Sequence, residues 1–499
     1  MAKEMKSLAK DTAIYGISSI VGKFINWLLV PFYTFVLASE ADYGIVTNLY
    51  AWTAFLVVIL TYGMETGFFR FANKDKTEAD KVYSTTLTSV GATSLIFAVL
   101  CVMFSQSIAS WMGYPNHSEF IAMLGVVVAM DAFAAIPFAY LRYKSRPIKF
   151  AALKLLYIAL NVSFNLFFFL ACPWIMTKAP DLISWFYNPS YGVGYVFVAN
   201  ILSTTIQTLF LLPQLKIKFD FDGALLKKML RYSLPLLILG VAGIMNQTVD
   251  KIIFPFLFAD KAEAATQLGI YGACFKISMV MMMFTQAFRY AYEPFIFARH
   301  KDKNSMTTYA DIMKFFIIFS LLIFLGIMFY LDIFKLLING KLDYRDGLRV
   351  VPIVLWSYIF QGIFFNLSIW YKLKDKTMYG AWISTIGAVI TLSVNIIFVP
   401  IYGYMASAWA SFACFLTMML ISYFIGQKYM RINYDLKSIA IYTVVALALF
   451  GASFLIDTSS QFVNLSYRTV LLIIFVALIV KRDFPLSQIS VINRFVKKK

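Results

Sequence analysis

Seven charged or amide side chains lie inside long apolar stretches of the sequence and are its strongest candidates for chemistry. They are Lys23, Asn26, Asp131, Gln247, Asp250, Lys251 and Lys276. An ionisable group at the centre of a membrane costs roughly 2.5–3.5 kcal/mol on insertion scales, so such groups usually face a protein interior or an aqueous cavity. The seven residues therefore predict a polar cavity inside a membrane-spanning body.

The lysines and the carboxylates in this set predict different chemistry. Lys23 has no acidic residue within one helical turn, so we expect it to attract an anion such as a diphosphate, with help from Lys276 or Lys251. Asp131 and Asp250 are candidates for binding a coupling proton or sodium ion, because a carboxylate in a partly dehydrated cavity can exchange protons. The alternative is structural, with Asp250 neutralising Lys251 or Lys276 and holding helices together.

The composition requires membrane helices to position these groups. Of the 499 residues, 61% are hydrophobic and 14% are charged, whereas about a quarter of a soluble domain is charged. A bilayer core of about 30 Å needs about 20 apolar residues per helix. Fourteen transmembrane helices are predicted, at residues 12–37, 43–67, 82–106, 119–141, 150–172, 191–213, 230–258, 267–292, 309–331, 348–371, 378–399, 403–425, 437–456 and 463–480. The predicted fold class is therefore an all-α integral membrane protein, not a soluble enzyme.

The basic residues predict the orientation of these helices. Most of the 44 Lys and Arg residues fall in the loops on the N-terminal side of the predicted membrane, and cytoplasmic loops are the ones that carry such an excess. Both termini are therefore predicted to be cytoplasmic. Topology explains most of the net charge of +18, and because the basic residues are dispersed, no nucleic-acid partner is expected.

The first six predicted helices recur in the next six. Collinear matches join Pro31 to Pro255, Gly44 to Gly269, Asn165 to Asn395, and Tyr191-Gly192 to Tyr402-Gly403. An even number of helices per copy keeps both copies in the same orientation, so two repeated lobes should enclose a central cavity near mid-membrane. We expect an N-lobe at residues 1–215, a C-lobe at 216–428, and two further helices with a basic tail at 429–499.

The polar positions recur in the same register. Lys23 aligns with Gln247, Asn26 with Asp250, and Asp131 with Gln361. Residues three apart lie on one helical face, so the first two matches put two polar pairs on helices that could face one cavity. The predicted polar lining consists of Asn26, Gln247, Asn246, Gln361, Asn165 and Asn395.

Several short motifs and the helix arrangement resemble those of a known transporter family. The basic N-terminal segment, Gly16, Pro31, Tyr43-Gly44, and the run from Gly63 through Glu65 to Arg70 resemble the polysaccharide-export branch of the MOP superfamily, the Wzx-type O-antigen flippases. The resemblance implies a bacterial inner-membrane transporter of undecaprenyl-diphosphate-linked oligosaccharides, in contact with membrane lipids. It also implies that polymerase and chain-length proteins of the same lipopolysaccharide or polysaccharide pathway are possible partners.

Other functions remain as alternatives. A multidrug exporter of the related MATE branch would favour acidic cavity residues, whereas three lysines here face two carboxylates. A membrane oligosaccharide polymerase would need a site for sugar chemistry, but the only histidines, His117 and His300, are predicted on opposite sides. No enzyme activity, cofactor or metal site is therefore expected.

Three charged residues near predicted cytoplasmic helix ends are candidates for a gate. These residues are Glu65, Arg70 and Arg289. Charge at a helix end reaches water at low cost by snorkelling, so these positions favour a gate or a structural pair over a substrate site.

Overall fold

Helices make up all the regular structure that is described. The computed structural model describes residues 21–25, 27–74, 77–216, 220–299, 305–338, 344–374, 376–456 and 458–483. Within these ranges every element is a helix. The longer ones are α2 (Glu40–Thr61), α3 (Met64–Lys74), α4 (Ala79–Met103), α5 (Ser105–Met112), α6 (Ser118–Tyr143), α7 (Pro147–Leu166), α9 (Gly194–Leu211), α10 (Gly223–Ile253), α11 (Lys261–Arg299), α12 (Ser305–Phe329), α14 (Val350–Leu367), α16 (Thr377–Tyr402), α17 (Tyr404–Tyr429), α18 (Leu436–Ala452) and α19 (Gln461–Arg482).

The helical segments confirm the predicted membrane spans. Twelve described segments are long and apolar enough to cross a bilayer, and two shorter apolar helices, Val21–Val36 and Leu436–Ala452, accompany them. Each of these fourteen segments corresponds to one of the fourteen predicted spans, with differences at the ends and an internal break in the second span. The chain is therefore a multi-pass membrane protein, and the all-α prediction is confirmed.

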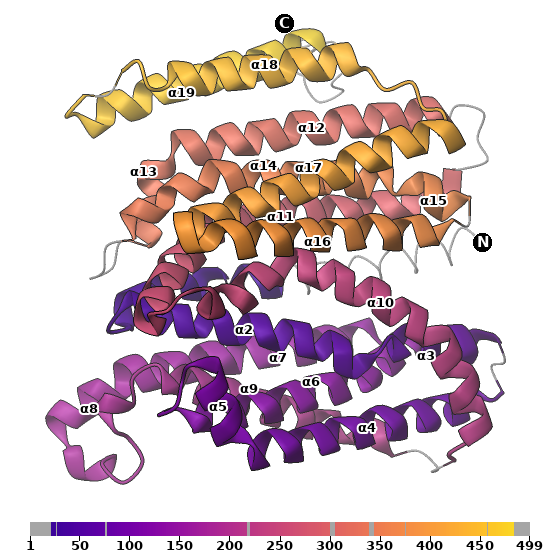
Figure 1. Cartoon of the computed structure of the whole chain (residues 1–499), viewed down its shortest axis with the longest axis vertical. Helices are drawn as coiled ribbons and strands as arrows, with labels where there is room; N and C mark the ends of the chain where they lie inside the picture. The colour runs from indigo at the N-terminus through magenta and orange to yellow at the C-terminus, as the bar shows by residue number, and fades with distance from the viewer. Residues whose placement is uncertain are drawn as a thin grey trace, which may run out of the picture.

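The helices gather into two bundles with a helix pair alongside (Figure 1). In the first bundle α6 packs against α2, α4 and α9, and α7 packs against α9. In the second, α14 packs against α11, α12 and α17, and α16 packs against α17. The two sets of contacts correspond in the order that the sequence repeat predicts. The matched glycines Gly192 and Gly403 both have positive φ angles, of 50° and 59°, which glycine adopts without a steric penalty.

The second predicted span is broken into two helices, where the sequence predicted one from residue 43 to residue 67. α2 ends at Thr61, its C-cap Tyr62 has a φ angle of 30°, and Gly63 follows with a φ angle of 71°. A Cβ on Gly63 would lie 2.8 Å from the carbonyl oxygen of Ser233 in α10. Glycine therefore permits both the turn and the close contact between α3 and α10. Apolar length alone carries no signal for such a break.

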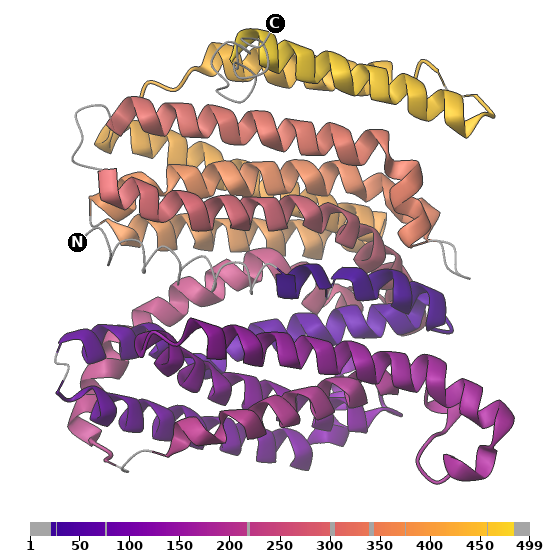
Figure 2. The ribbon, with the colours of Figure 1, turned by 180° about the vertical axis from the view of Figure 1, so that it is seen from behind.

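The fifth span is longer than predicted. After α7, a π-helical turn η1 (Phe167–Ala171) leads into α8 (Cys172–Lys178), so part of the loop predicted after residue 172 is helical. The short turns η2 (Pro180–Leu182) and η3 (Pro189–Tyr191) follow before α9. Figure 2 shows this segment projecting at one end of the first bundle.

The bundles meet most closely where α2 crosses α11. A Cβ on Gly44 would overlap the carbonyl oxygen of Ala265, and a Cβ on Gly269 would overlap the carbonyl oxygen of Glu40. Only residues without side chains allow the two backbones to approach this closely. The two glycines that the repeat matches are therefore the ones that meet across the junction.

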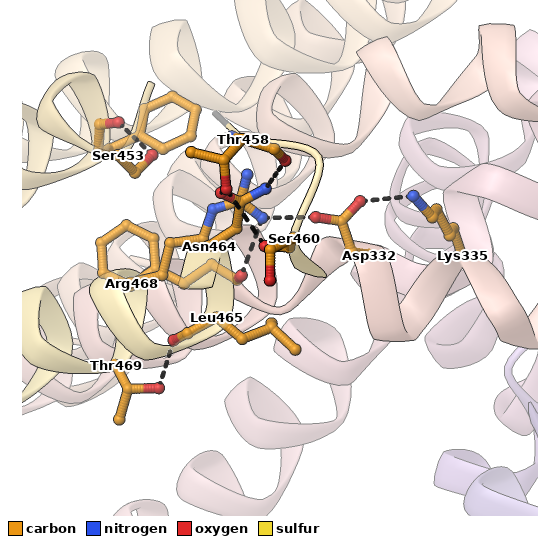
Figure 3. Close-up of polar contacts among 11 residues, drawn as sticks. Asp332, Lys335, Ser453, Thr458, Ser460, Asn464, Leu465, Arg468 and Thr469 are labelled. Atoms are coloured by element: carbon orange, nitrogen blue, oxygen red, sulfur yellow. Dashed lines mark hydrogen bonds and ion pairs between the residues drawn. The ribbon is translucent and has the colours of Figure 1, made fainter. Parts of the chain in front are cut away.

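The C-terminal helices α18 and α19 lie on the side of α12 that faces away from the two bundles (Figures 1 and 2). At one end of the pair, Lys314 of α12 donates to Asp483 at 2.7 Å. At the other end, Arg468 of α19 donates to Asp332 at 2.6 Å, and Lys335 donates to the same carboxylate at 2.6 Å (Figure 3). Asp332 belongs to α13 (Leu331–Phe334), which follows α12. Ion pairs thus attach both ends of the pair to α12 and its extension.

Weakening one of these attachments should loosen α19. We expect Arg468→Met to lower stability by roughly 1 kcal/mol, as for a partly exposed ion pair, and to make residues 453–460 easier to cleave in limited proteolysis. Burial alone would raise the pKa of Asp332, but hydrogen bonds from Lys335 and Arg468 outweigh burial and hold the pKa below its ordinary value. The stabilisation by the ion pairs of ionised Asp332 is therefore complete at neutral pH and is lost as the pH falls through the lowered pKa of Asp332. Lys178→Met, at an exposed cation in α8, is the control, and equal cleavage of both variants would contradict the prediction.

Candidate functional site

A cavity with a volume of about 490 Å³ lies between the two bundles. Its walls come from the helix Val21–Val36 and from α2, α6, α7 and α9 on one side, and from α10, α11 and α14 on the other. Five of the residues predicted to be functional line it, namely Lys23, Asp131, Gln247, Lys251 and Lys276. The structure therefore brings together charged side chains that are more than 200 residues apart in sequence.

Two of the three lysines have no acidic partner among the described residues. The Lys23 ammonium donates to the Oε1 atom of Gln286, a neutral amide on α11. Lys276 lines the cavity about 15 Å along α11 from Gln286, given a rise of 1.5 Å per residue. The indole of Trp27 donates to the backbone oxygen of Lys276 at 2.7 Å, which joins the first helix to α11. Lys23 and Lys276 thus present positive charge at two depths.

The third lysine is compensated. Lys251 donates to Asp250 at 2.8 Å, and the hydroxyl of Tyr271 donates to the same carboxylate oxygen at 2.8 Å. The Lys251 ammonium also lies 3.9 Å from the centroid of the Phe275 ring. Asp250 is only 2% exposed, so the pair is held inside the second bundle. Asp250 thus neutralises Lys251, one of the two ion pairs that the structural alternative proposed for Asp250.

The other predicted carboxylate faces the cavity. Asp131 of α6 lines the first-bundle wall and interacts electrostatically with Lys154 of α7. The Lys154 ammonium lies 4.1 Å from the centroid of the Phe138 ring. Asp131 is therefore the accessible carboxylate of the two, whereas Asp250 is enclosed.

Four of the predicted polar lining residues lie away from this cavity. Asn165 accepts from the Tyr33 hydroxyl at 3.0 Å and donates to the Asn161 carbonyl at 2.7 Å. Asn395 donates to the Thr391 carbonyl at 2.7 Å and accepts from Ser407 at 2.7 Å. The two matched asparagines thus make the same helix contact four residues back, and each also bonds to a neighbouring helix.

Asn246 and Gln361 are buried in the second bundle. Asn246 donates to the Ser384 carbonyl at 3.1 Å, and Gln361 of α14 is 3% exposed. Sequence position placed them on the correct helices but did not predict which face each helix turns inward. Asn26 lies outside the described residues.

The three candidate gate residues do not form one cluster. Glu65 pairs with Arg142 of α6, not with Arg70. Residues five apart on a helix lie on different faces, which explains why Glu65 and Arg70 do not meet. Arg70 lies 4.0 Å from the centroid of the Tyr232 ring of α10, and Arg289 lies 5.1 Å from that of Phe365. Of these three contacts, only the one between Arg70 and Tyr232 joins α3 to α10.

Three residues of the polar wall of the first bundle carried no prediction from the sequence. The Asn200 amide donates to the Tyr50 hydroxyl at 3.1 Å, and the Tyr157 hydroxyl donates to Asn200 at 3.4 Å. All three residues line the cavity together with Asn161. The side chains of Tyr50, Tyr157 and Asn200 carry no formal charge, so the cost of placing a charge in the membrane does not single them out. Their mid-span positions, away from the interfaces where tyrosine is enriched, were the available signal.

Comparisons with known proteins agree with this architecture. Residues 8–298, more than half of the chain, match the model of the polysaccharide biosynthesis protein family. Residues 242–397 match the MatE model. No match was found among the curated proteins.

Solved transporter structures have the same fold. The lipid II flippase MurJ in its inward closed conformation superposes with a TM-score of 0.74 at 14% identity, covering 94% of this chain and 99% of MurJ. An inward-facing multidrug resistance MATE family transporter gives a TM-score of 0.65 at 14% identity, covering 83% and 96%. A MOP superfamily transporter from Pyrococcus furiosus gives 0.53 at 15% identity, covering 84% and 95%. The chain therefore belongs to the polysaccharide biosynthesis protein family, within the MOP superfamily of membrane transporters.

Proposed function

We propose that this protein is a flippase for an undecaprenyl-diphosphate-linked oligosaccharide, the repeat unit of an O-antigen, capsule or exopolysaccharide. The observation that carries the proposal is the cavity between the bundles, where Lys23 and Lys276 form no ion pair with a carboxylate of the described residues. A diphosphate supplies the missing negative charge, and the remaining volume accepts uncharged polar groups. Lys251 contributes less than the sequence predicted, because Asp250 already compensates it.

Alternating access is the proposed mechanism. The α2–α11 contact at Gly44 and Gly269 closes one end of the cavity, which the positive-inside distribution assigns to the periplasmic side. The substrate enters from the cytoplasmic side, and separation of α2 from α11 then opens the opposite end. The N-lobe at 1–215 and the C-lobe at 216–428 move relative to each other, and α18 and α19 move with the C-lobe through their contacts with α12.

The proposed setting is the bacterial inner membrane, with both termini in the cytoplasm and membrane lipids around the spans. Glycan polymerase and chain-length proteins would use the translocated product. Transport is proposed to be coupled to a proton, a sodium ion or the membrane potential. Asp131 is the carboxylate with access to the cavity, whereas Asp250 would first have to leave Lys251 and Tyr271.

A MATE-type drug exporter is the second candidate, favoured by the match of residues 242–397 to the MatE model. Its cationic substrates would be repelled by Lys23 and Lys276. The experiment is therefore transport in proteoliposomes of the full-length protein, comparing a lipid-linked saccharide diphosphate with lipophilic cations under imposed proton, sodium and potential gradients. We expect movement of the saccharide lipid only. Movement of cations alone would reject the flippase, and indifference to all three gradients would reject coupling.

A further inference from the structure

The cavity has two chemically different walls. Three lysines line the cavity. Lys23 comes from the helix Val21–Val36, whereas Lys251 and Lys276 come from the second bundle, where they line the cavity with Phe275, Met279 and Met282. The first-bundle wall has no described cation beyond Lys23 in its lining and presents hydroxyl and amide groups with one carboxylate. Its hydroxyl, amide and carboxylate groups include those of Tyr50, Asp131, Tyr157, Asn161 and Asn200, and we call these five residues the N-lobe wall.

The N-lobe wall is fixed in place before any ligand binds. Asn161 and Asn200 are 5% and 6% exposed, and Asn200 is hydrogen-bonded to both Tyr50 and Tyr157. The Oδ1 atom of Asn161 accepts from Asn165 at 3.3 Å. A polar wall that is already ordered loses little conformational entropy when it binds a ligand. The arrangement is thus suited to recognition and not merely to solvation.

These contacts leave hydrogen-bonding capacity toward the cavity. The Tyr50 hydroxyl accepts from Asn200 and retains its own proton to donate, and an amide such as that of Asn161 has two donor hydrogens. Asp131 contributes carboxylate oxygens that accept from hydroxyl or ammonium groups. Alternating donors and acceptors beside aromatic rings match the hydroxyl-covered surface of a sugar.

The charge of the wall limits which sugars fit. Asp131 is the only carboxylate among the described residues that line the cavity, and Lys154 interacts with it from the adjacent helix α7. A uronic acid placed against this wall would bring two carboxylates together, and like charges repel at a desolvated interface, although Lys154 offsets part of the charge of Asp131. A hydroxymethyl or amino group at the same position would instead donate to Asp131. Repulsion of the wrong ligand is a common source of specificity.

We propose that the N-lobe wall recognises the saccharide of the substrate and that Asp131 selects repeat units whose diphosphate-proximal sugars are neutral or amino sugars over those containing a uronic acid. This inference rests on the proposed flippase function. It assigns the diphosphate to Lys23 and Lys276, and the sugar to the N-lobe wall. Selectivity then depends on residues other than the two that bind the diphosphate.

The test compares substrates that differ in one group. Full-length protein in proteoliposomes is given polyprenyl diphosphates bearing a neutral disaccharide, the same disaccharide with one hydroxymethyl oxidised to carboxylate, or no sugar. We expect the neutral substrate to move at least about tenfold faster than the uronic one. Asp131→Asn should reduce this ratio to about threefold or less, whereas Asp181→Asn, at an exposed loop carboxylate, should leave it unchanged.

The ratio of rates separates selectivity from a general loss of activity, because an effect of Asp131 on coupling would slow both saccharide substrates alike. Tyr157→Phe is the second variant, and it should slow the neutral saccharide substrate more than the sugar-free lipid. Equal wild-type rates for neutral and uronic substrates, or an unchanged ratio in folded Asp131→Asn, would overturn this inference and leave the flippase intact. If the wild-type protein moves none of the lipid diphosphates, both proposals fail.

Discussion

Replacing Lys276 by glutamine should weaken binding of a lipid-linked diphosphate by at least about 30-fold, because removal of one partner of a desolvated charge pair costs roughly 2 kcal/mol or more. Lys276 lines the cavity beside Lys251 and has no acidic partner among the described residues. Its loss therefore leaves no buried carboxylate uncompensated, and the variant should fold. Lys23→Gln should have a similar effect, and Lys23→Glu should abolish transport by repelling the diphosphate.

Binding can be measured by ligand-induced thermal stabilisation of the purified protein and transport by its flipping assay. Lys428→Gln, which removes an exposed cation near the end of α17, is the matched control and should bind normally. Lys251 behaves differently, because its removal strands Asp250 in the protein interior, an arrangement that typically costs about 3–5 kcal/mol. Unchanged transport by Lys23→Glu, with normal insertion, would refute the cationic site.

Replacing Gly44 by alanine should hold the cavity open at the end where α2 crosses α11. The added Cβ would overlap the Ala265 carbonyl oxygen, and backbone at a helix crossing cannot yield as a flexible side chain would. Overpacking of this kind costs about 1–3 kcal/mol, which corresponds to a roughly 5- to 150-fold shift between closed and open states. Gly269→Ala should act in the same way, since its Cβ would overlap the Glu40 carbonyl oxygen.

The measurement is the rate at which a membrane-impermeant maleimide labels Thr53→Cys, a cavity position, in a background without native cysteines. Labelling from the side that the proposed orientation makes periplasmic should accelerate, and transport should fall. Gly326→Ala is the control, because an added Cβ there meets nothing within 4 Å. If Gly44→Ala and Gly326→Ala label at the same rate, the glycine contact does not control the opening.

The sequence alone determined the membrane architecture. Each span needs only enough consecutive apolar residues to cross the bilayer, and this is a local property of the chain. The internal repeat could also be recognised from the sequence, because matched residues such as Asn165 and Asn395 recur in register. In the structure both asparagines donate to the backbone carbonyl four residues earlier in their own helices. Intramembrane lysines pointed to a cavity because a charge that costs several kcal/mol in lipid requires water or a partner.

Only the tertiary structure decided which polar residues share the cavity. Sequence spacing gave Asp250 two candidate partners, and packing selected Lys251, so that Lys276 has no carboxylate partner within the described part of the chain. Packing likewise paired Glu65 with Arg142 of α6, 77 positions away. It also assembled the wall of Tyr50, Tyr157 and Asn200, whose neutral side chains gave little warning in the sequence. The physical reason is that helical periodicity fixes the relative faces of residues within one helix, whereas the rotation of each helix about its axis depends on all of its neighbours at once.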